Sequence, residues 1–173
     1  MPALTLETIY AEHFEMVWRA VRRFGVPDRS LDDAVQDVFL VVHRRLDDFE
    51  GRSSLRTWLY GIARRVAHDH RRRASRKERD GELPESVADA SPSPRETAEV
   101  AEAVAVLHEI LAQLSDDQRD VFVLAELEQM TAPEIAEALD AKVNTVYSRL
   151  RLARAAFNAA VARHTARDDR SRP

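Results

Sequence analysis

Residues 131–157 combine side chains suited to reading DNA bases with the spacing of a helix pair. The run T-A-P-E-I-A-E-A-L opens with a capping box, because Thr131 and Glu134 can each bond the other's backbone amide. Pro133 suits a first helical turn, where its missing N–H donor is not needed. The break at residues 140–142 has the length that joins two helices at a steep angle. The sequence therefore predicts a helix-turn-helix whose second helix begins at about Asn144.

The second helix of this motif should expose a basic and polar face. Val146, Leu150, Ala153 and Phe157 recur at helical spacing and should face the interior. The side chains left on or beside the exposed face are Thr145, Tyr147, Ser148, Arg149, Arg151, Leu152 and Arg154. Arginine can bond guanine through two hydrogen bonds, serine can bond several base edges, and further cations can hold phosphate. With no acid between residues 141 and 166, this face predicts a duplex-DNA interface. The alternative is a solvated basic helix in a three-helix packing unit.

A second cationic surface is predicted earlier in the chain. The net charge is −4, yet residues 52–79 hold ten basic residues against two acids, and local field rather than net charge decides affinity for nucleic acid. A helix from Leu55 to about Arg73 would bury Leu55, Leu59, Ile62 and Val66, and Trp58 is favoured as a core residue over a base-stacking one. Its cations away from that stripe are Arg64, Arg65, His68, Arg71 and Arg72.

Two more helices should precede this segment. The first carries the stripe Leu6, Tyr10, Phe14 (or His13), Val17, Val21 and Phe24, and Gly25 with Pro27 ends it. The second should be capped by Ser30 with Asp33, and its stripe is Leu31, Val35, Val38, Val42 and Leu46. On another face of that helix Asp33, Gln36, Asp37 and Leu40 line up as a partly acidic ridge. From the residues alone such a ridge is a solvated surface.

An acidic segment divides the helices into two groups. Five acids oppose one base over residues 81–99, and three prolines forbid a continuous helix. Near the end of this segment, a capping box at Ser93–Glu96 opens a helix with the stripe Val100, Val104, Leu107, Leu111 and Leu114, and a second box, Ser115–Gln118, caps the helix that follows. We therefore expect an all-α chain of two small helical domains, 1–76 and 100–166, joined by a flexible acidic linker, 77–99, with a polar, disordered tail, 167–173.

Several classes of function are disfavoured. The chain has no cysteine, and the spacing of its histidines fits no metal site. No apolar run approaches the roughly 18 residues that span a bilayer, and no secretion signal opens the chain, so we expect a cytoplasmic protein without membrane insertion. No nucleophile elbow, phosphate-binding glycine loop or carboxylate pair suggests an enzyme, and no cofactor is expected. Nothing demands a dimer, so the free chain is expected to be a monomer.

Two runs resemble one family. Residues 32–73, with D-D-A-V-Q-D-V-F and S-S-L-R-T-W-L-Y-G-I-A-R-R, resemble region 2 of the extracytoplasmic-function (ECF) sigma factors, small two-domain members of the sigma-70 family. Residues 114–154, with L-S-D-D-Q-R-D-V-F and V-N-T-V-Y-S-R-L-R, resemble region 4 of the same family. The two runs occur in the family's order.

The resemblance implies roles for the surfaces described above. The ridge of Asp33, Gln36, Asp37 and Leu40 would dock on core RNA polymerase. The residues that would hold the minus-10 element of promoter DNA are Phe49, Arg52, Ser53 and Ser54 in the base-capturing loop, and Arg64, Arg65, His68 and Arg72 on the basic helix. Tyr147, Ser148, Arg151 and Leu152 match positions that read the minus-35 element, with Arg149 and Arg154 on phosphate. Family members are often held inactive by an anti-sigma factor, commonly membrane-bound, which implies such a partner here.

Two positions depart from the family's pattern. Arg65 stands where an asparagine is common in the minus-10 helix, which leaves the minus-10 preference open. Asp140 stands at the turn glycine of the helix-turn-helix, and aspartate tolerates left-handed backbone geometry better than most residues. We therefore expect the turn to be kept. The alternative function is a two-domain helix-turn-helix regulator that does not replace a sigma factor, although it leaves the ridge and the basic helix unexplained.

Overall fold

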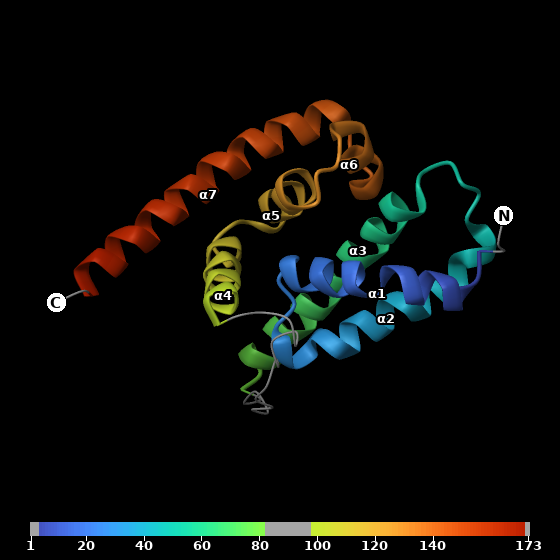
Figure 1. Ribbon diagram of the computed structural model, residues 1–173, viewed down its shortest axis with the longest axis horizontal. Helices are drawn as coiled ribbons and strands as arrows, with labels where there is room; N and C mark the ends of the chain where they lie inside the picture. Colours follow the sequence, from blue (N-terminus) through green and yellow to red (C-terminus); the bar gives the residue numbers. More distant parts are fainter. Residues whose placement is uncertain (1–3, 82–97, 172–173) are drawn as a thin grey trace. The chain divides into compact units, whose positions relative to one another are not determined.

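The computed structural model describes residues 4–81 and 98–171, and within these ranges all regular structure is helical, as expected for an all-α chain (Figure 1). The chain divides into two compact units, and each is described by itself. The first unit contains α1 (Leu6–Arg23), η1 (Asp28–Ser30), α2 (Leu31–Arg45), η2 (Leu46–Asp48) and α3 (Leu55–Arg79). The second contains α4 (Ala98–Ala112), α5 (Asp116–Phe122), the π-helical turn η3 (Val123–Leu127), the larger part of α6 (Ala132–Leu139) and α7 (Val143–Ser171).

The first unit is a three-helix cluster in which each helix packs on the other two. Val17, Val21, Val38, Val42 and Leu59 are fully buried in it, as the apolar stripes predict. A capping box that the sequence analysis missed begins α1: the backbone N–H of Thr8 donates to Thr5 Oγ1, and the N–H of Thr5 donates to Thr8 Oγ1.

Two predictions for the first unit are wrong in detail. Ser30 does not cap α2 with its side chain, because Pro27 starts a 3-10 turn and Ser30 closes it through a backbone bond to the Pro27 carbonyl. Tyr10 is not a core residue, since its side chain is 49% exposed and the neighbouring Ile9 takes the buried position. The Tyr10 ring instead lies against Phe14 and Phe39, at centroid distances of 5.1 and 4.7 Å.

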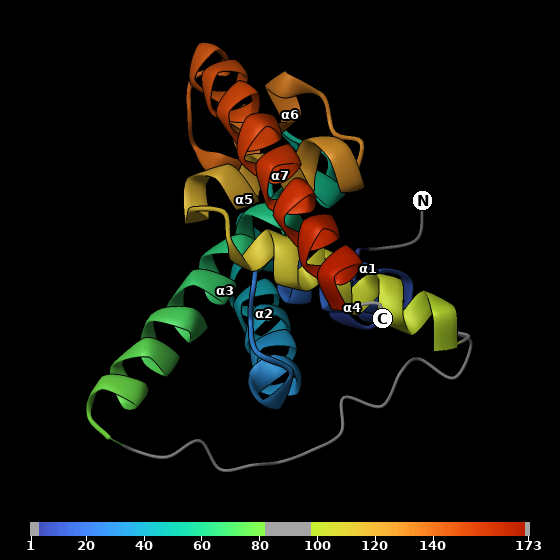
Figure 2. The same ribbon diagram turned by 90° about the vertical axis from the view of Figure 1, so that its left-hand side faces the viewer.

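The basic helix α3 is longer than its apolar stripe suggests. Ser54 caps it by accepting from the backbone N–H of Thr57, and the helix continues to Arg79, past the predicted end at Arg73 (Figure 2). No glycine or proline lies between Arg73 and Gly81, and most residues of the added turns are good helix formers. An ion pair of 3.1 Å between Arg29 and Glu78 connects the added turn to η1.

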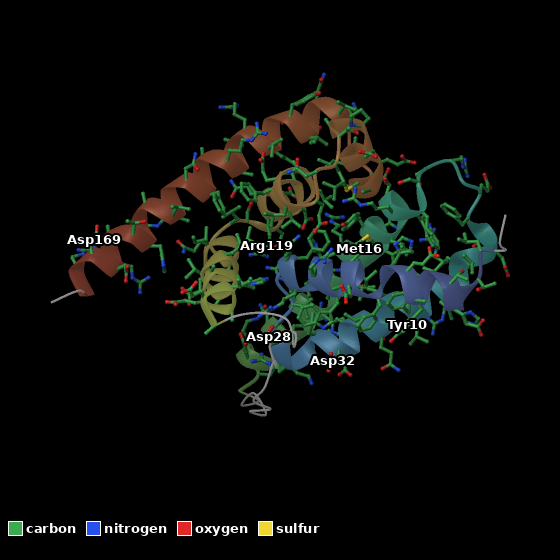
Figure 3. The ribbon with its side chains drawn as sticks, in the orientation of Figure 1. Tyr10, Met16, Asp28, Asp32, Arg119 and Asp169 are labelled. Atoms are coloured by element: carbon green, nitrogen blue, oxygen red, sulfur yellow. The ribbon has the colours of Figure 1, made fainter. Side chains whose placement is uncertain are left out.

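In the second unit a buried arginine joins α4 to α5. Arg119 is 3% exposed and donates to the carbonyl oxygens of Leu111 (2.8 Å), Leu114 (3.1 Å) and Ala112 (3.3 Å), which satisfies acceptors at the open end of α4. Figure 3 shows it between the two helices. The predicted capping box of Ser115 and Gln118 is confirmed by both reciprocal bonds. The box predicted at residues 93–96 and most of the predicted linker lie outside the described residues.

The apolar stripe of α4 is confirmed only at its end. Leu111 and Leu114 are buried, whereas Val100, predicted in the same stripe, is 46% exposed. A helix face is buried only where another element covers it, and residues 98–100 in the first turn of α4 are all exposed.

The last helix, α7, extends to Ser171, so the prediction of a disordered tail from residue 167 is wrong for the residues that are described. No glycine or proline lies between Asn144 and Ser171. Ala160, fully buried, continues the interior stripe beyond Phe157, and Arg163 donates to Gln113 at 2.9 Å. Asp169 marks the final turns in Figure 3. None of the helices in the described part of the chain is long and apolar enough to span a membrane.

Candidate nucleic-acid interface

The helix-turn-helix of the second unit is built as its local sequence predicts. The backbone N–H of Thr131 donates to Glu134 Oε2 at 2.7 Å, and the N–H of Glu134 donates to Thr131 Oγ1 at 3.4 Å. After α6, Asp140 takes a positive φ of 50°, so the predicted turn is kept without glycine. Gln129, before α6, also has a positive φ, 56°, which no pattern in the sequence predicted. A left-handed residue therefore follows α6 directly, and another lies in the connection between η3 and α6.

The interior and exposed faces of α7 separate cleanly. Val146 and Ala153 are fully buried and Leu150 is 8% exposed. Phe157 stacks on Phe122 with ring centroids 4.3 Å apart and planes at 20°. This packing fixes the rotation of α7 in the second unit, and therefore which side chains face solvent.

Four of the predicted base-reading side chains share the exposed face. Tyr147 is 59% exposed and Leu152 is 49% exposed, and Ser148 and Arg151 are exposed beside them. Ser148 Oγ donates to the carbonyl oxygen of Thr145 at 3.0 Å, so its lone pairs remain available as acceptors. Thr145 itself is half-buried. We call Tyr147, Ser148, Arg151 and Leu152 the readout face.

The two arginines assigned to phosphate are already paired. Arg149 Nη2 lies 3.0 Å from Asp117 Oδ2 of α5. Nε and Nη2 of Arg154 both lie 2.7 Å from Glu126 Oε1 of η3. The sequence analysis missed both pairs, because the acids lie in earlier elements and α7 has no acid near these arginines.

In the first unit the predicted ridge lies along α2. Asp33, Gln36 and Leu40 are exposed, Leu40 to 44%. Asp37 differs from them because its Oδ2 lies 2.7 Å from Nε2 of His70 on α3. The ridge therefore presents two exposed polar side chains, one anchored carboxylate and one apolar side chain.

Beside the ridge lies a groove of about 520 Å³ between α1 and α2. Its lining residues are Leu6, Tyr10, Phe14, Asp32, Val35, Gln36, Phe39, Leu40 and His43. Figure 3 labels Tyr10 on α1 and Asp32 on α2. The sequence analysis missed this groove because Tyr10 was placed in the core. The i, i+4 pair of Tyr10 and Phe14 was the available signal, but only the structure shows that Tyr10 is not covered.

The loop between η2 and α3 carries Arg52, Ser53 and Ser54, and Phe49 precedes it. The Phe49 ring lies against Trp58 at a centroid distance of 4.9 Å, which supports the loop from one side. Arg52 Nη2 pairs with Glu50 at 2.9 Å while remaining 81% exposed. Ser54 is occupied as the helix cap of α3.

The predicted cations of α3 differ in exposure. Arg65 and Arg72 are exposed, and Arg72 pairs with Asp69 on its own helix. Arg64 and His68 are half-buried. Because the helix also carries exposed Arg73, Arg76, Lys77 and Arg79, its cationic surface is longer than the predicted site. Such a surface suits phosphate binding.

Comparisons with known proteins agree with this arrangement. A family model described as "Sigma-70 region 2" matches residues 9–77, and one described as "Sigma-70, region 4" matches residues 105–157. The chain is 32% identical over 159 residues to RNA polymerase sigma factor CnrH of Cupriavidus metallidurans, covering 87% of this chain and 83% of CnrH. It is 33% identical over 143 residues to ECF sigma factor SigC of Mycobacterium tuberculosis, covering 82% of this chain and 75% of SigC.

Solved structures share the fold. CnrH in complex with the cytosolic domain of CnrY superposes with a TM-score of 0.67 at 29% identity, covering 91% of this chain and 87% of that one. The sigma factor RpoE bound to the anti-sigma factor NepR, from Bartonella quintana, gives a TM-score of 0.71 at 22% identity, covering 90% and 96%. The matched regions, in this order and over this length, show that the chain belongs to the ECF sigma factors of the sigma-70 family.

Proposed function

We propose that this sigma factor docks on core RNA polymerase through α2 and the groove beside it, and directs initiation by reading two promoter elements. One observation carries the docking proposal: an aromatic-lined groove of about 520 Å³ adjoins the exposed side chains of Asp33, Gln36 and Leu40. Exposed apolar surface rimmed by polar residues is typical of protein interfaces, and aromatic anchors supply much of their binding energy. Leu40 contributes to both the ridge and the groove.

The minus-10 element is assigned to the loop of residues 49–54 and to α3. Phe49 and Trp58 pack together beside the loop, and Arg52 and Ser53 in the loop would contact an unpaired strand. Arg64, Arg65, His68 and Arg72 follow on α3, where phosphate contacts would position the strand. Arg65 is exposed, and it stands where family members commonly have another residue. We therefore assign to Arg65 whatever preference for the minus-10 sequence is particular to this chain.

The minus-35 element is assigned to the readout face of α7. A helix of this kind enters the major groove, where Arg151 can bond guanine through two hydrogen bonds and Leu152 can contact a thymine methyl group. Ser148 can accept from a base amino group, since its own proton is used within the helix. Tyr147, which is 59% exposed, adds an aromatic ring to the face.

An anti-sigma factor is a further proposed partner. The relative CnrH has been solved with the cytosolic domain of CnrY bound to it. A partner that covers the groove and the ridge would compete with the polymerase for the same side chains. It would therefore keep the sigma factor inactive without touching its DNA-reading face.

The test is run-off transcription with purified core RNA polymerase on a genomic fragment library, with and without the protein. We expect new discrete start sites with the wild-type chain and their loss with Asp33→Arg, which reverses a charge on the ridge. Glu15→Arg is the matched control: it makes the same charge change on an exposed position of α1 that does not line the groove, and it should leave the start sites intact. If specific duplex binding persists while core binding and new start sites are absent, the chain is a regulator that does not replace a sigma factor.

A further inference from the structure

We propose that Asp117 and Glu126 limit the sequence-independent DNA affinity of the second unit by competing with DNA phosphate for Arg149 and Arg154. The inference rests on the proposed minus-35 role of α7. It assigns a function to two carboxylates that lie outside the helix-turn-helix itself, in α5 and η3.

The geometry places the two pairs on either side of the readout face. At 3.6 residues per turn, Arg149 and Arg154 fall at the two borders between the buried stripe of α7 and its exposed face. Arg149 meets Asp117 at 3.0 Å on one border, and Arg154 meets Glu126 at 2.7 Å on the other. Arg151, between these borders, forms no ion pair with any described residue.

Both ion pairs neutralise an arginine that is assigned to phosphate, and neither neutralises the arginine that is assigned to bases. Phosphate contacts carry no sequence information, whereas base-edge contacts do. The acids therefore occupy the two arginines suited to phosphate and leave the arginine suited to bases unoccupied. A duplex of arbitrary sequence therefore meets less positive charge on α7 than the number of its arginines suggests.

The strength of the two ion pairs determines how much the carboxylates can weaken DNA binding. Asp117 is 53% exposed and Arg149 32%, and Arg154 is 59% exposed and Glu126 34%. Pairs so open to solvent are weak, so phosphate can displace the carboxylates. The acids consequently attenuate binding, by roughly two- to five-fold per pair, and do not abolish it.

The experiment measures the affinity of the full chain for a short duplex of arbitrary sequence by fluorescence anisotropy over a range of KCl concentrations. Asp117→Asn and Glu126→Gln are each expected to tighten binding roughly two- to five-fold at low salt. The slope of log affinity against log salt should steepen by up to about 0.9 for each arginine released. Glu109→Gln, an exposed position of α4 with the same charge change, is the control and should shift neither quantity by as much.

A second set of variants separates release of an arginine from a general change of charge or stability. In an Arg149→Gln background, Asp117→Asn should have no further effect, because no arginine remains to be released. The proposal is overturned if Asp117→Asn tightens binding equally in both backgrounds, or no more than Glu109→Gln does. If affinities do not change while run-off transcription succeeds, this inference fails and the proposed function stands. If no variant binds duplex DNA, both this inference and the minus-35 assignment fail.

Discussion

Nε2 of His70 lies 2.7 Å from Oδ2 of Asp37, which joins the basic helix α3 to the ridge helix α2. His70 is 11% exposed at its side chain and Asp37 is 43% exposed, so the bond is partly screened from water. Asp37 therefore belongs to the proposed polymerase-docking ridge and also to the contact between two helices. A change at this bond should alter both the stability of the first unit and the shape of its ridge.

His70→Ala is expected to lower the free energy of unfolding by about 1 kcal/mol, since it removes a partly exposed hydrogen bond to a carboxylate. Asp37→Asn should have a smaller effect, because the amide can still accept a hydrogen bond. Urea denaturation of the two single variants and the double variant measures the coupling between the positions. If the free-energy losses of the two single variants simply add in the double variant, the hydrogen bond is contradicted, since contacting residues show non-additive effects.

Arg119→Leu should destabilise the second unit by roughly 2 to 4 kcal/mol, because three carbonyl acceptors at and just after the end of α4 lose a charged donor. Arg163→Leu offers a comparison, as it removes an exposed arginine with one bond to Gln113 and should cost under about 0.5 kcal/mol. Thermal and urea unfolding of both variants check the difference. Equal losses would show that Arg119 does not organise the junction of α4 and α5.

Two substitutions of Asp140 should change the free energy of unfolding in opposite directions. Asp140→Gly should be neutral or stabilise by up to about 1 kcal/mol, because glycine adopts a φ of 50° without strain. Asp140→Val should destabilise by about 1 to 3 kcal/mol, since a β-branched residue is strained in that region. The transition midpoint in urea reports both. A stabilising valine would mean that the turn is not left-handed in solution.

Binding to a panel of minus-35 sequences can distinguish the role of the readout face from the role of the phosphate-binding arginines. Ser148→Ala and Arg151→Ala should change the order of preference, with a loss of about 1 to 3 kcal/mol at the contacted base for Arg151. Arg154→Ala should weaken all sequences similarly, since it removes a phosphate-binding cation and leaves Glu126 unpaired near the DNA. A uniform loss in all three variants would show that the face is wrongly assigned.

The salt dependence of single-strand binding tests the added length of α3. Replacing Arg76 and Lys77 with glutamine should lower the slope of log affinity against log salt by up to about 0.7 for each phosphate that the helix no longer neutralises. Arg44→Gln, an exposed cation on α2, should leave the slope unchanged. If all three substitutions act equally, the effect is one of total charge and not of the α3 surface.

The sequence by itself determined where the main helices lie, though not all of their ends, as well as the turn of the helix-turn-helix and two capping boxes. Thr131 with Glu134, and Ser115 with Gln118, interact three residues apart, so helix geometry alone brings them together. The same local periodicity separated Val146 and Ala153 from Tyr147 and Arg151. Resemblance to a family, carried by two runs of residues, then supplied the sigma factor function that the comparisons support.

The tertiary structure decided which charges are available and which aromatic side chains are covered. Asp37 and His70 are 33 positions apart, and Glu126 and Arg154 are 28 apart, so no local pattern could pair them. Tyr10 has the spacing of a core residue, yet it borders a groove because the packing of α1 on α2 leaves its ring uncovered. Helix periodicity determines the direction of a side chain around its own axis, but only packing determines what it meets there.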